Sequence, residues 1–314
     1  MTERTLPQVV IDPGMPSAVR IFEVGPRDGL QNESTVVDVQ DKVAFIRRLR
    51  RAGLSAIEVT SFVHPRWVPQ LADAEEVIAA LAADDHDRVT MPVLVPNERG
   101  LDRARTAGVR HIGVFASATE TFAQRNLNRS LDGQFDMIIP TVRAALSEGM
   151  DVRGYVSMCF GDPWEGAVPL SQVVDAGMRL LDAGISELSL GDTIGVGTPG
   201  HVTALLAAFA EAGADLRRIA LHFHDTYGQA LSNVQAGMRA GVTTFDASAG
   251  GLGGCPYALS ATGNLATEDL VWMLDGLGIR HGVDLGALVE TSVWMASRLG
   301  RPAPSRVVAA LGGG

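Results

Sequence analysis

Short runs of apolar, often β-branched residues alternate along the chain with longer stretches in which apolar positions recur every three or four residues. The short runs predict strands, and the longer stretches predict amphipathic helices. The expected strands are Val19–Val24, Ala56–Thr60, Val89–Val95, His111–Ala116, Val152–Ser157, Glu187–Leu190, Ile219–His224 and Thr243–Ala247. The expected helices that alternate with them are Val39–Ala52, Ala74–Ala83, Glu98–Ala107, Phe135–Glu148, Leu170–Ala183, Pro199–Ala212 and Gln229–Ala240.

This alternation of strand and helix predicts a parallel sheet covered by helices. Eight strands over about 250 residues favour a closed (β/α)8 TIM barrel. The alternative is a doubly wound open sheet, but no Gly-x-Gly-x-x-Gly pattern follows the first strand, which weakens a dinucleotide-binding interpretation. We expect an N-terminal extension at 1–18, a catalytic barrel at 19–266, and C-terminal helices with a tail packed on the barrel at 267–314.

Composition narrows the class of protein. The 314 residues are 46% hydrophobic, enough for one large domain with a sizeable core. The net charge of −10 argues against nucleic acid as a partner, because phosphate binding needs a basic surface. Two cysteines allow at most one disulfide, and no apolar run is long enough to span a membrane. The first 18 residues lack a basic start followed by an apolar stretch, so we expect a cytoplasmic protein.

Polar and glycine-rich segments follow five of the predicted strands at their carboxyl ends. In a barrel these ends form the face that carries the active site, because the loops from strand to helix build it. The segments are Glu23–Gly29, Glu58–Ser61, Gly191–Thr193, His222–Asp225 and Gly250–Tyr257. The sequence therefore predicts that these segments share one catalytic face.

His222 and His224 stand two positions apart on a predicted strand, so both imidazoles point to the same face. They are either structural histidines or ligands of one metal ion. Asp28, on a turn with Gly25 and Pro26, is either a further ligand or an ordinary turn aspartate. Asn264 would add an amide oxygen. Two imidazoles, one carboxylate and one amide, with no thiolate, suit Mg²⁺ or Mn²⁺, with Zn²⁺ as an alternative.

Arg27 places a fixed cation beside Asp28. It would stabilise negative charge that develops on a substrate oxygen. The alternative for Arg27 is an ion pair with Glu23 or Glu58, and the two interpretations are compatible. Glu58 and Asp192 belong to the same rim, either as support for Arg27 or as proton-transfer groups.

Cys255 follows a segment that contains four glycines after the last predicted strand. Such a density of glycine indicates a loop that moves or that approaches a ligand closely. A thiol there would deliver or remove a proton, unless it is a bystander. Cys159 lies in an apolar run and is expected to be a buried structural residue. Tyr155, near the end of the fifth strand, would line the pocket.

Several long segments occur in a fixed order along residues 19–300. They are Gly25-Pro-Arg-Asp-Gly-Leu-Gln-Asn-Glu33, Glu58-Val-Thr-Ser-Phe-Val63 with Trp67-Val-Pro-Gln70, Ser189-Leu-Gly-Asp-Thr-Ile-Gly-Val-Gly197, His222-Phe-His-Asp-Thr-Tyr-Gly-Gln229, and Gly250-Gly-Leu-Gly-Gly-Cys-Pro-Tyr-Ala258 with Ala261-Thr-Gly-Asn-Leu-Ala-Thr-Glu-Asp269. Together they resemble the 3-hydroxy-3-methylglutaryl-CoA lyases. The resemblance implies a (β/α)8 barrel that splits this acyl-CoA substrate into acetyl-CoA and acetoacetate with a divalent cation.

The resemblance also implies a role for each candidate residue. The implied metal ligands, for Mg²⁺ or alternatively Mn²⁺ and with no organic cofactor, are Asp28, His222, His224 and Asn264. The implied catalytic residues are Arg27 for the enolate oxygen, Cys255 as the mobile-loop acid and base, and Glu58 and Asp192 as supporting carboxylates. The base for the hydroxyl proton is either Asp192 or His222. The expected substrate-binding residues are Gln31, Ser61, Tyr155 and Thr193.

The chain departs from the family pattern at Ser34, where lysine is frequent, and at Met158 and Asp162, where cysteines are common. These differences bear on the CoA contacts and the acyl pocket, so a longer branched 3-hydroxyglutaryl-CoA is an alternative substrate. A condensing transferase that joins acetyl-CoA to a 2-oxo acid, and a non-catalytic metal-dependent binding protein, are further alternatives. The resemblance also implies a homodimer and a place in leucine degradation.

Overall fold

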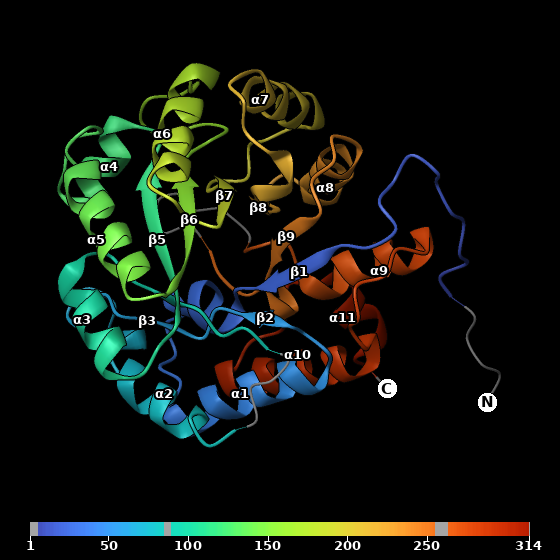
Figure 1. Ribbon diagram of the computed structural model, residues 1–314. Coiled ribbons are helices and arrows are strands. Elements are labelled where there is room, and N and C mark those ends of the chain that lie inside the picture. The colour runs from blue at the N-terminus through green and yellow to red at the C-terminus, as the bar shows by residue number, and fades with distance from the viewer. Residues whose placement is uncertain (1–5, 85–88, 255–262, 314) are drawn as a thin grey trace.

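A parallel sheet of short strands forms the centre of the computed structural model, and helices surround it (Figure 1). The structure describes residues 6–84, 89–254 and 263–313. Neighbouring strands are parallel throughout, in the order β2-β1-β9-β8-β7-β6-β5-β4-β3. The strands are β1 (Arg20–Glu23), β2 (Ala56–Ile57), β3 (Thr60–Ser61), β4 (Val93–Leu94), β5 (His111–Ser117), β6 (Asp151–Ser157), β7 (Glu187–Asp192), β8 (Ile219–Phe223) and β9 (Thr244–Ala247).

The two ends of this order belong to one stretch of chain, because β2 and β3 are halves of the single strand predicted at 56–60. β2 pairs with β1, whereas β3 pairs with β4. Across the interruption, Ile57 N donates to Thr90 O and Val59 N donates to Pro92 O, each over 3.0 Å. The sheet is therefore closed. The predicted (β/α)8 barrel is confirmed, and the open-sheet alternative is wrong.

Helices cover the outside of the barrel in the order of the chain (Figure 1). They are α1 (Val39–Arg51), α2 (Ala74–Leu81), α3 (Glu98–Thr106), α4 (Glu120–Leu127), α5 (Phe135–Ser147), α6 (Leu170–Asp182), α7 (Pro199–Glu211), α8 (Ala230–Arg239), α9 (Thr267–Leu277), α10 (Leu285–Leu299) and α11 (Arg306–Leu311). Shorter helical turns are η1 (Gly25–Gly29), η2 (Pro69–Leu71), η3 (Leu216–Arg218) and η4 (Ala249–Gly251). The sequence did not predict α4, because this helix buries only Phe122 and Ala123 and so has little apolar periodicity.

The C-terminal helices extend the ring around the barrel. α9 follows β9 and contacts α8, so it takes the place of the eighth barrel helix. The predicted boundary at 266 thus falls between the last strand and its helix. α10 packs along α1, and α11 packs against α9 and α10. Across residues 6–84, 89–254 and 263–313, no helix has the length and apolar character needed to cross a membrane.

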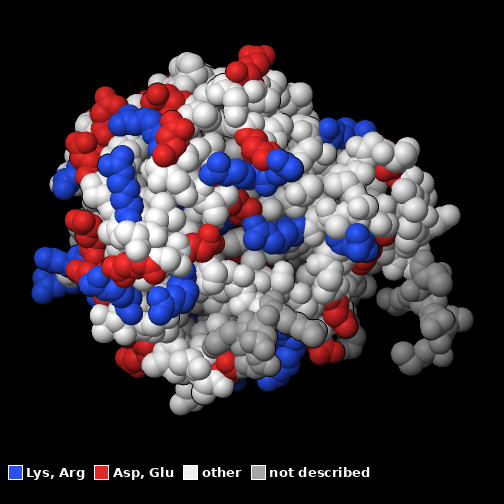
Figure 2. Space-filling model, viewed as in Figure 1, with Lys and Arg blue, Asp and Glu red and all other residues white. Residues whose placement is uncertain are grey.

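Side chains along each strand alternate between the helix-facing layer and the barrel interior. Leu221 on β8 and Phe245 on β9 face outward, where both lie against Gly237 of α8. The adjacent residues His222 and Asp246 therefore face the interior, and the hydrogen bond between them agrees with this placement. On the face of the molecule seen in Figure 2, acidic and basic side chains are interspersed.

Candidate active site

Three of the predicted metal ligands meet at the carboxyl ends of the strands. Asp28 belongs to η1, the π-helical turn that follows β1, and His222 is the penultimate residue of β8. His224 lies just beyond β8 and forms a β-bridge with Asn264. One ligand atom from each of Asp28, His222 and His224 lies within 4.8 Å of the others. The carboxylate and the two imidazoles are therefore placed to bind one ion.

Glycines allow η1 to approach η4, the turn that follows β9. A Cβ atom at Gly29 would lie 2.7 Å from Ser248 Oγ and 3.0 Å from the Leu252 side chain. A Cβ atom at Gly25 would lie 2.5 Å from the Glu23 carboxylate. A side chain at Gly29 would push η1, and with it Asp28, away from the end of β9, and one at Gly25 would displace the Glu23 carboxylate.

Asn264 completes the candidate ligand set. Its Nδ2 donates to Asp28 Oδ2 over 2.8 Å and to Leu252 O over 3.1 Å, so the amide oxygen is left for another partner. Among the described residues, that Oδ1 and the Nδ1 of His224 are buried without a hydrogen-bond partner. A buried polar atom without a partner is costly, and a cation would satisfy the amide oxygen. The residues present therefore fit a divalent metal ion.

The electrostatics of the cluster favour the forms that bind metal. Burial alone would raise the pKa of Asp28, but nearby Arg27, His222 and His224 outweigh it and lower the pKa to about 2. Burial, helped by neighbouring His222, lowers the pKa of His224 to about 4, although Asp28 opposes the shift. At neutral pH, Asp28 is therefore ionised and His224 is neutral, as metal binding requires.

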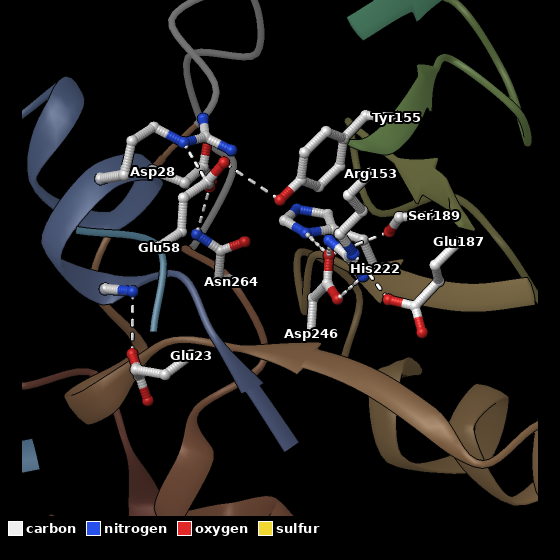
Figure 3. A network of polar contacts seen from close by, with 12 residues as sticks. Glu23, Asp28, Glu58, Arg153, Tyr155, Glu187, Ser189, His222, Asp246 and Asn264 are labelled. Carbon is white, nitrogen blue, oxygen red and sulfur yellow. Dashed lines mark hydrogen bonds and ion pairs between the residues drawn. The ribbon is translucent and has the colours of Figure 1, made fainter. Parts of the chain in front are cut away.

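Arg27 lies beside the three candidate metal ligands, and two carboxylates hold its guanidinium. Its Nε donates to Glu58 Oε2 over 2.6 Å, and its Nη1 donates to Asp28 Oδ1 over 2.7 Å. The hydroxyl of Tyr155 donates to the other oxygen of Glu58 over 3.1 Å. These contacts fix the guanidinium beside Asp28. Figure 3 shows Asp28, Glu58 and Tyr155 in the same region of the site. Of the two ion pairs considered for Arg27, the structure thus contains the one with Glu58.

Glu23, the other residue considered as an ion-pair partner of Arg27, binds backbone amides and a hydroxyl instead. Its buried carboxylate accepts from Gly25 N and Ala249 N, each over 2.8 Å, and from Thr267 Oγ1 over 2.7 Å. The suggested Arg27–Glu23 ion pair is therefore wrong. Glu23 instead ties β1 to η4 and to the start of α9, because three segments of chain converge on one carboxylate.

Asp192 lies at the carboxyl end of β7 and does not belong to the group of candidate metal ligands Asp28, His222 and His224. Its two oxygens accept from Val196 N and Gly197 N, each over 2.9 Å. Burial raises the pKa of Asp192 to about 6, although these amides and His222 oppose the shift. Gly191, which precedes it, pairs with His222 across β7 and β8. Asp192 is thus close enough to His222 for the imidazole to influence the pKa of its carboxyl.

Three predicted substrate-binding residues make no hydrogen bond to Asp28, His222 or His224 in the part of the chain that the structure describes. Ser61 Oγ accepts from Val63 N over 3.1 Å, and Thr193 Oγ1 accepts from Met158 N over 2.9 Å. Gln31 is half-buried two residues after the end of η1. These side chains hold or border the loops around the site, and their contact with substrate stays a prediction.

Cys255 lies outside the described residues, but the glycine segment that leads to it is described. Gly250, Gly251 and Gly253 have φ values of 70°, 71° and 109°, a backbone region that favours glycine. A Cβ atom at Gly253 would lie 2.6 Å from Asn264 Nδ2. The glycines therefore allow this segment to pass directly beside the predicted amide ligand.

Sequence reasoning missed the charged side chains inside the barrel. Asp246, Arg153 and Glu187 are connected to His222 by hydrogen bonds and ion pairs (Figure 3). A signal existed, because Arg153 and Asp246 interrupt otherwise apolar predicted strands. Burial of such residues requires a charged partner, but the sequence alone does not name the partner.

The closed (β/α)8 barrel carries a candidate divalent-metal site and a fixed arginine at the carboxyl ends of its strands. This is the face on which barrel enzymes hold their active sites, so the chain has the architecture of a metal-dependent barrel enzyme. A family model described as HMGL-like matches residues 18–294. The chain belongs to the hydroxymethylglutaryl-CoA lyase family.

Individual relatives agree with this assignment. The chain is 47% identical over 302 residues to the mitochondrial hydroxymethylglutaryl-CoA lyase of Arabidopsis thaliana, covering 96% of this chain and 64% of that protein. It is 46% identical over 297 residues to the 3-hydroxy-3-isohexenylglutaryl-CoA/hydroxymethylglutaryl-CoA lyase of Pseudomonas aeruginosa, covering 95% and 98% of the two chains.

A solved structure shares the fold over nearly the whole length. It is that of an HMG-CoA lyase from Acinetobacter baumannii in complex with coenzyme A and 3-methylmalate, with 34% identity and a TM-score of 0.89. The match covers 96% of this chain and 97% of that chain. The barrel described above is therefore the fold of the family.

Proposed function

We propose that this chain is a carbon–carbon lyase that cleaves 3-hydroxy-3-methylglutaryl-CoA to acetyl-CoA and acetoacetate. The observation that carries the proposal is the cluster of Asp28, His222 and His224, with Arg27 bonded to Asp28 over 2.7 Å. A retro-Claisen cleavage needs one group that binds the substrate hydroxyl and a positive charge near the enolate that forms. Relatives named as lyases of this substrate, and one solved with coenzyme A, support the same chemistry and an acyl-CoA substrate here.

A divalent cation fits the residues of the cluster, and we propose Mg²⁺, with Mn²⁺ as the alternative. Asp28, His222, His224 and Asn264 would hold it, since the first three converge and Asn264 Oδ1 is buried without a partner among the described residues. When bound, the cation lowers the pKa of the substrate hydroxyl and orients it. The chemistry requires no organic cofactor.

Proton transfer begins at the tertiary hydroxyl. We assign the base to Asp192, because its pKa of about 6 makes it ionised at neutral pH. His222 is the weaker candidate, since its Nδ1 is already bonded to Asp246. As the proton leaves, the O–H electron pair forms the ketone of acetoacetate. The C–C bond breaks, and its electron pair forms the thioester enolate of acetyl-CoA.

Arg27 then stabilises the enolate oxygen, because a charge held in place by Glu58 needs no reorganisation as the enolate forms. Cys255 then protonates the enolate carbon as the general acid. Asn32 Nδ2 donates to Gly254 O over 3.0 Å, which ties the last described residue before Cys255 to the chain shortly after η1. Gln31, Ser61, Tyr155 and Thr193 remain our candidates for contacts with the substrate.

A longer branched 3-hydroxyglutaryl-CoA is the second candidate substrate. The relative from Pseudomonas aeruginosa is named for both a longer isohexenyl substrate and the methyl substrate. A panel of 3-hydroxyglutaryl-CoA analogues with Mg²⁺, followed by acetyl-CoA formation, distinguishes the two. We expect the highest kcat/KM for the methyl substrate. A higher kcat/KM for an analogue with a longer chain would make that analogue the proposed substrate. If no analogue gave acetyl-CoA, the result would contradict a lyase activity and favour a non-catalytic binding protein.

A homodimer and a cytoplasmic location are further proposals. Family resemblance supports the homodimer, and light scattering of the purified chain measures its mass. Two cysteines in 314 residues suit a reducing compartment, which supports a cytoplasmic location. Cell fractionation tests that location.

A further inference from the structure

Asp246 on β9 lies directly behind the metal ligand His222. Its Oδ2 is 3.2 Å from His222 Nδ1, and it also accepts from Ser189 Oγ over 2.9 Å. Arg153 donates from Nη2 to Oδ1 over 2.6 Å and from Nη1 to Oδ2 over 3.1 Å. Figure 3 shows Asp246 between Arg153 and His222, with Ser189 beside it. The carboxylate side chain is fully shielded from solvent.

The surroundings of Asp246 decide which imidazole nitrogen carries the proton. Arg153 supplies two N–H donors to the carboxylate, so Asp246 is held as an ionised acceptor. An acceptor 3.2 Å from His222 Nδ1 requires a hydrogen on that nitrogen. The Nε2 of His222 then keeps its lone pair and is the nitrogen available to a cation.

We infer that Asp246 is a positioning residue for the metal site: it fixes the ring orientation and the Nδ1–H tautomer of His222, and Arg153 fixes Asp246. The inference rests on the proposed function, since it requires His222 to be a ligand. A carboxylate partner of this kind also makes the ligating imidazole more basic. Asp246 therefore sets the affinity of the site for metal without touching the metal or the substrate.

Arg153 is held from several sides, which keeps Asp246 in one orientation. Its Nε donates to Glu187 Oε1 over 2.7 Å, and Glu187 also pairs with Arg20. The Arg153 guanidinium lies 3.8 Å from the centroid of the Phe22 ring and 4.7 Å from that of Tyr155. Tyr155 in turn donates to Glu58, the partner of Arg27. Arg153 therefore contacts one residue next to His222 and another next to the Arg27–Glu58 pair.

Glu187 offers a matched control for Asp246. Both are acidic strand residues that bind Arg153, but Asp246 contacts His222, whereas Glu187 contacts Arg20. Changing either carboxylate to its amide removes one negative charge that faces the guanidinium of Arg153. A purely structural role would make the two substitutions equivalent. A positioning role makes Asp246→Asn weaken metal binding far more than Glu187→Gln, because glutamine still offers Arg153 Nε an acceptor oxygen and does not contact His222.

The test is a titration of the metal-stripped full chain with Mn²⁺, with free Mn²⁺ measured by electron paramagnetic resonance. We expect Asp246→Asn to raise the Kd for Mn²⁺ by about 10- to 100-fold, and Glu187→Gln to stay near wild type. Thermal unfolding of both variants without metal checks that each is folded. Equal Mn²⁺ affinity of Asp246→Asn and wild type would overturn this role and leave the proposed function intact. Absence of Mn²⁺ binding by the wild type would instead overturn the metal site, and both proposals with it.

If Asp246→Asn fails to fold, the wild type itself supplies the decisive measurement. Nitrogen-15 spectra of histidine-labelled, metal-free protein at alkaline pH report the tautomer of each ring, and His222→Gln assigns the His222 signals. We expect the hydrogen of His222 on Nδ1. A hydrogen on Nε2 would overturn the inference.

Discussion

The side-chain amide of Asn264 donates to the carboxylate of Asp28 over 2.8 Å, although 236 positions separate the two residues in the chain. This contact joins the loop after the first strand to the segment that precedes α9. It holds Asp28 Oδ2 in place and leaves Asn264 Oδ1 buried without a partner in the described ranges. Closure of the barrel thus brings together a ligand set that belongs to opposite ends of the sequence.

Arg27→Lys is expected to impair catalysis more than substrate binding. Lysine cannot reproduce the two contacts that Arg27 makes, from Nε to Glu58 and from Nη1 to Asp28. We expect kcat to fall by on the order of 10²–10³, the usual effect of losing a fixed donor at a developing negative charge. Steady-state kinetics measure it.

Arg103→Lys is the control for this substitution, because Arg103 also binds a carboxylate, Glu75, through two nitrogens, but at the surface. It should leave kcat unchanged. Wild-type kcat in Arg27→Lys would remove Arg27 from the mechanism.

Glu268 makes the stability of the fold depend on pH. Burial raises the pKa of Glu268 from its ordinary value of 4.5 to about 8, although hydrogen bonds from Ser292 and Gly250 N oppose the shift. The folded state therefore holds a proton that the unfolded chain loses above 4.5. It follows that the free energy of unfolding falls as pH rises between those values.

Glu268→Gln should reduce this pH dependence, since a glutamine is neutral throughout the range. Denaturant unfolding at several pH values measures the slope for both proteins. Glu290→Gln, on the exposed side of α10, is expected to keep the wild-type slope. An identical slope in Glu268→Gln and wild type would show that Glu268 does not titrate as described.

Cys255→Ser is expected to reduce turnover by on the order of 10²–10⁴, the usual effect of losing a general acid or base. Cys159 is the matched control. Its thiol is fully buried, donates to Val156 O over 3.1 Å, and has a pKa raised by burial, so it is chemically inert. Cys159→Ser should therefore retain turnover. Unchanged turnover in Cys255→Ser would exclude the thiol from the reaction.

Much of the site can be predicted from the sequence, because it depends on the two-residue repeat of a strand and on which residues follow each strand. His222 and His224 share a face since a strand repeats every two residues. Asp28 and Arg27 share a face with them because all parallel strands of a barrel end on the same side. The order of strands was equally predictable from their regular alternation with helices.

The interior partners were not predictable in the same way. Asp246 and Arg153 meet across 93 positions, and only the closed sheet decides which charged residue on one strand faces which on another. The closure of the barrel at β2 and β3 also depends on tertiary pairing, since Glu58 N donates to Glu23 O over 2.8 Å on one side and Val59 N donates to Pro92 O over 3.0 Å on the other. Such pairings depend on register and closure, which local sequence does not specify.

The most direct test of the account is the release of acetoacetate from 3-hydroxy-3-methylglutaryl-CoA by the wild type and by Asp28→Ala, each with Mg²⁺ and with a chelator. We predict equimolar acetoacetate and acetyl-CoA from the wild type with Mg²⁺ and loss of both with the chelator. We also predict a fall of at least about 10²-fold in Asp28→Ala, because the cation loses its one carboxylate ligand. Asp215→Ala, a surface substitution before η3, should match the wild type. Release that is insensitive to both the chelator and Asp28→Ala would contradict the central claim.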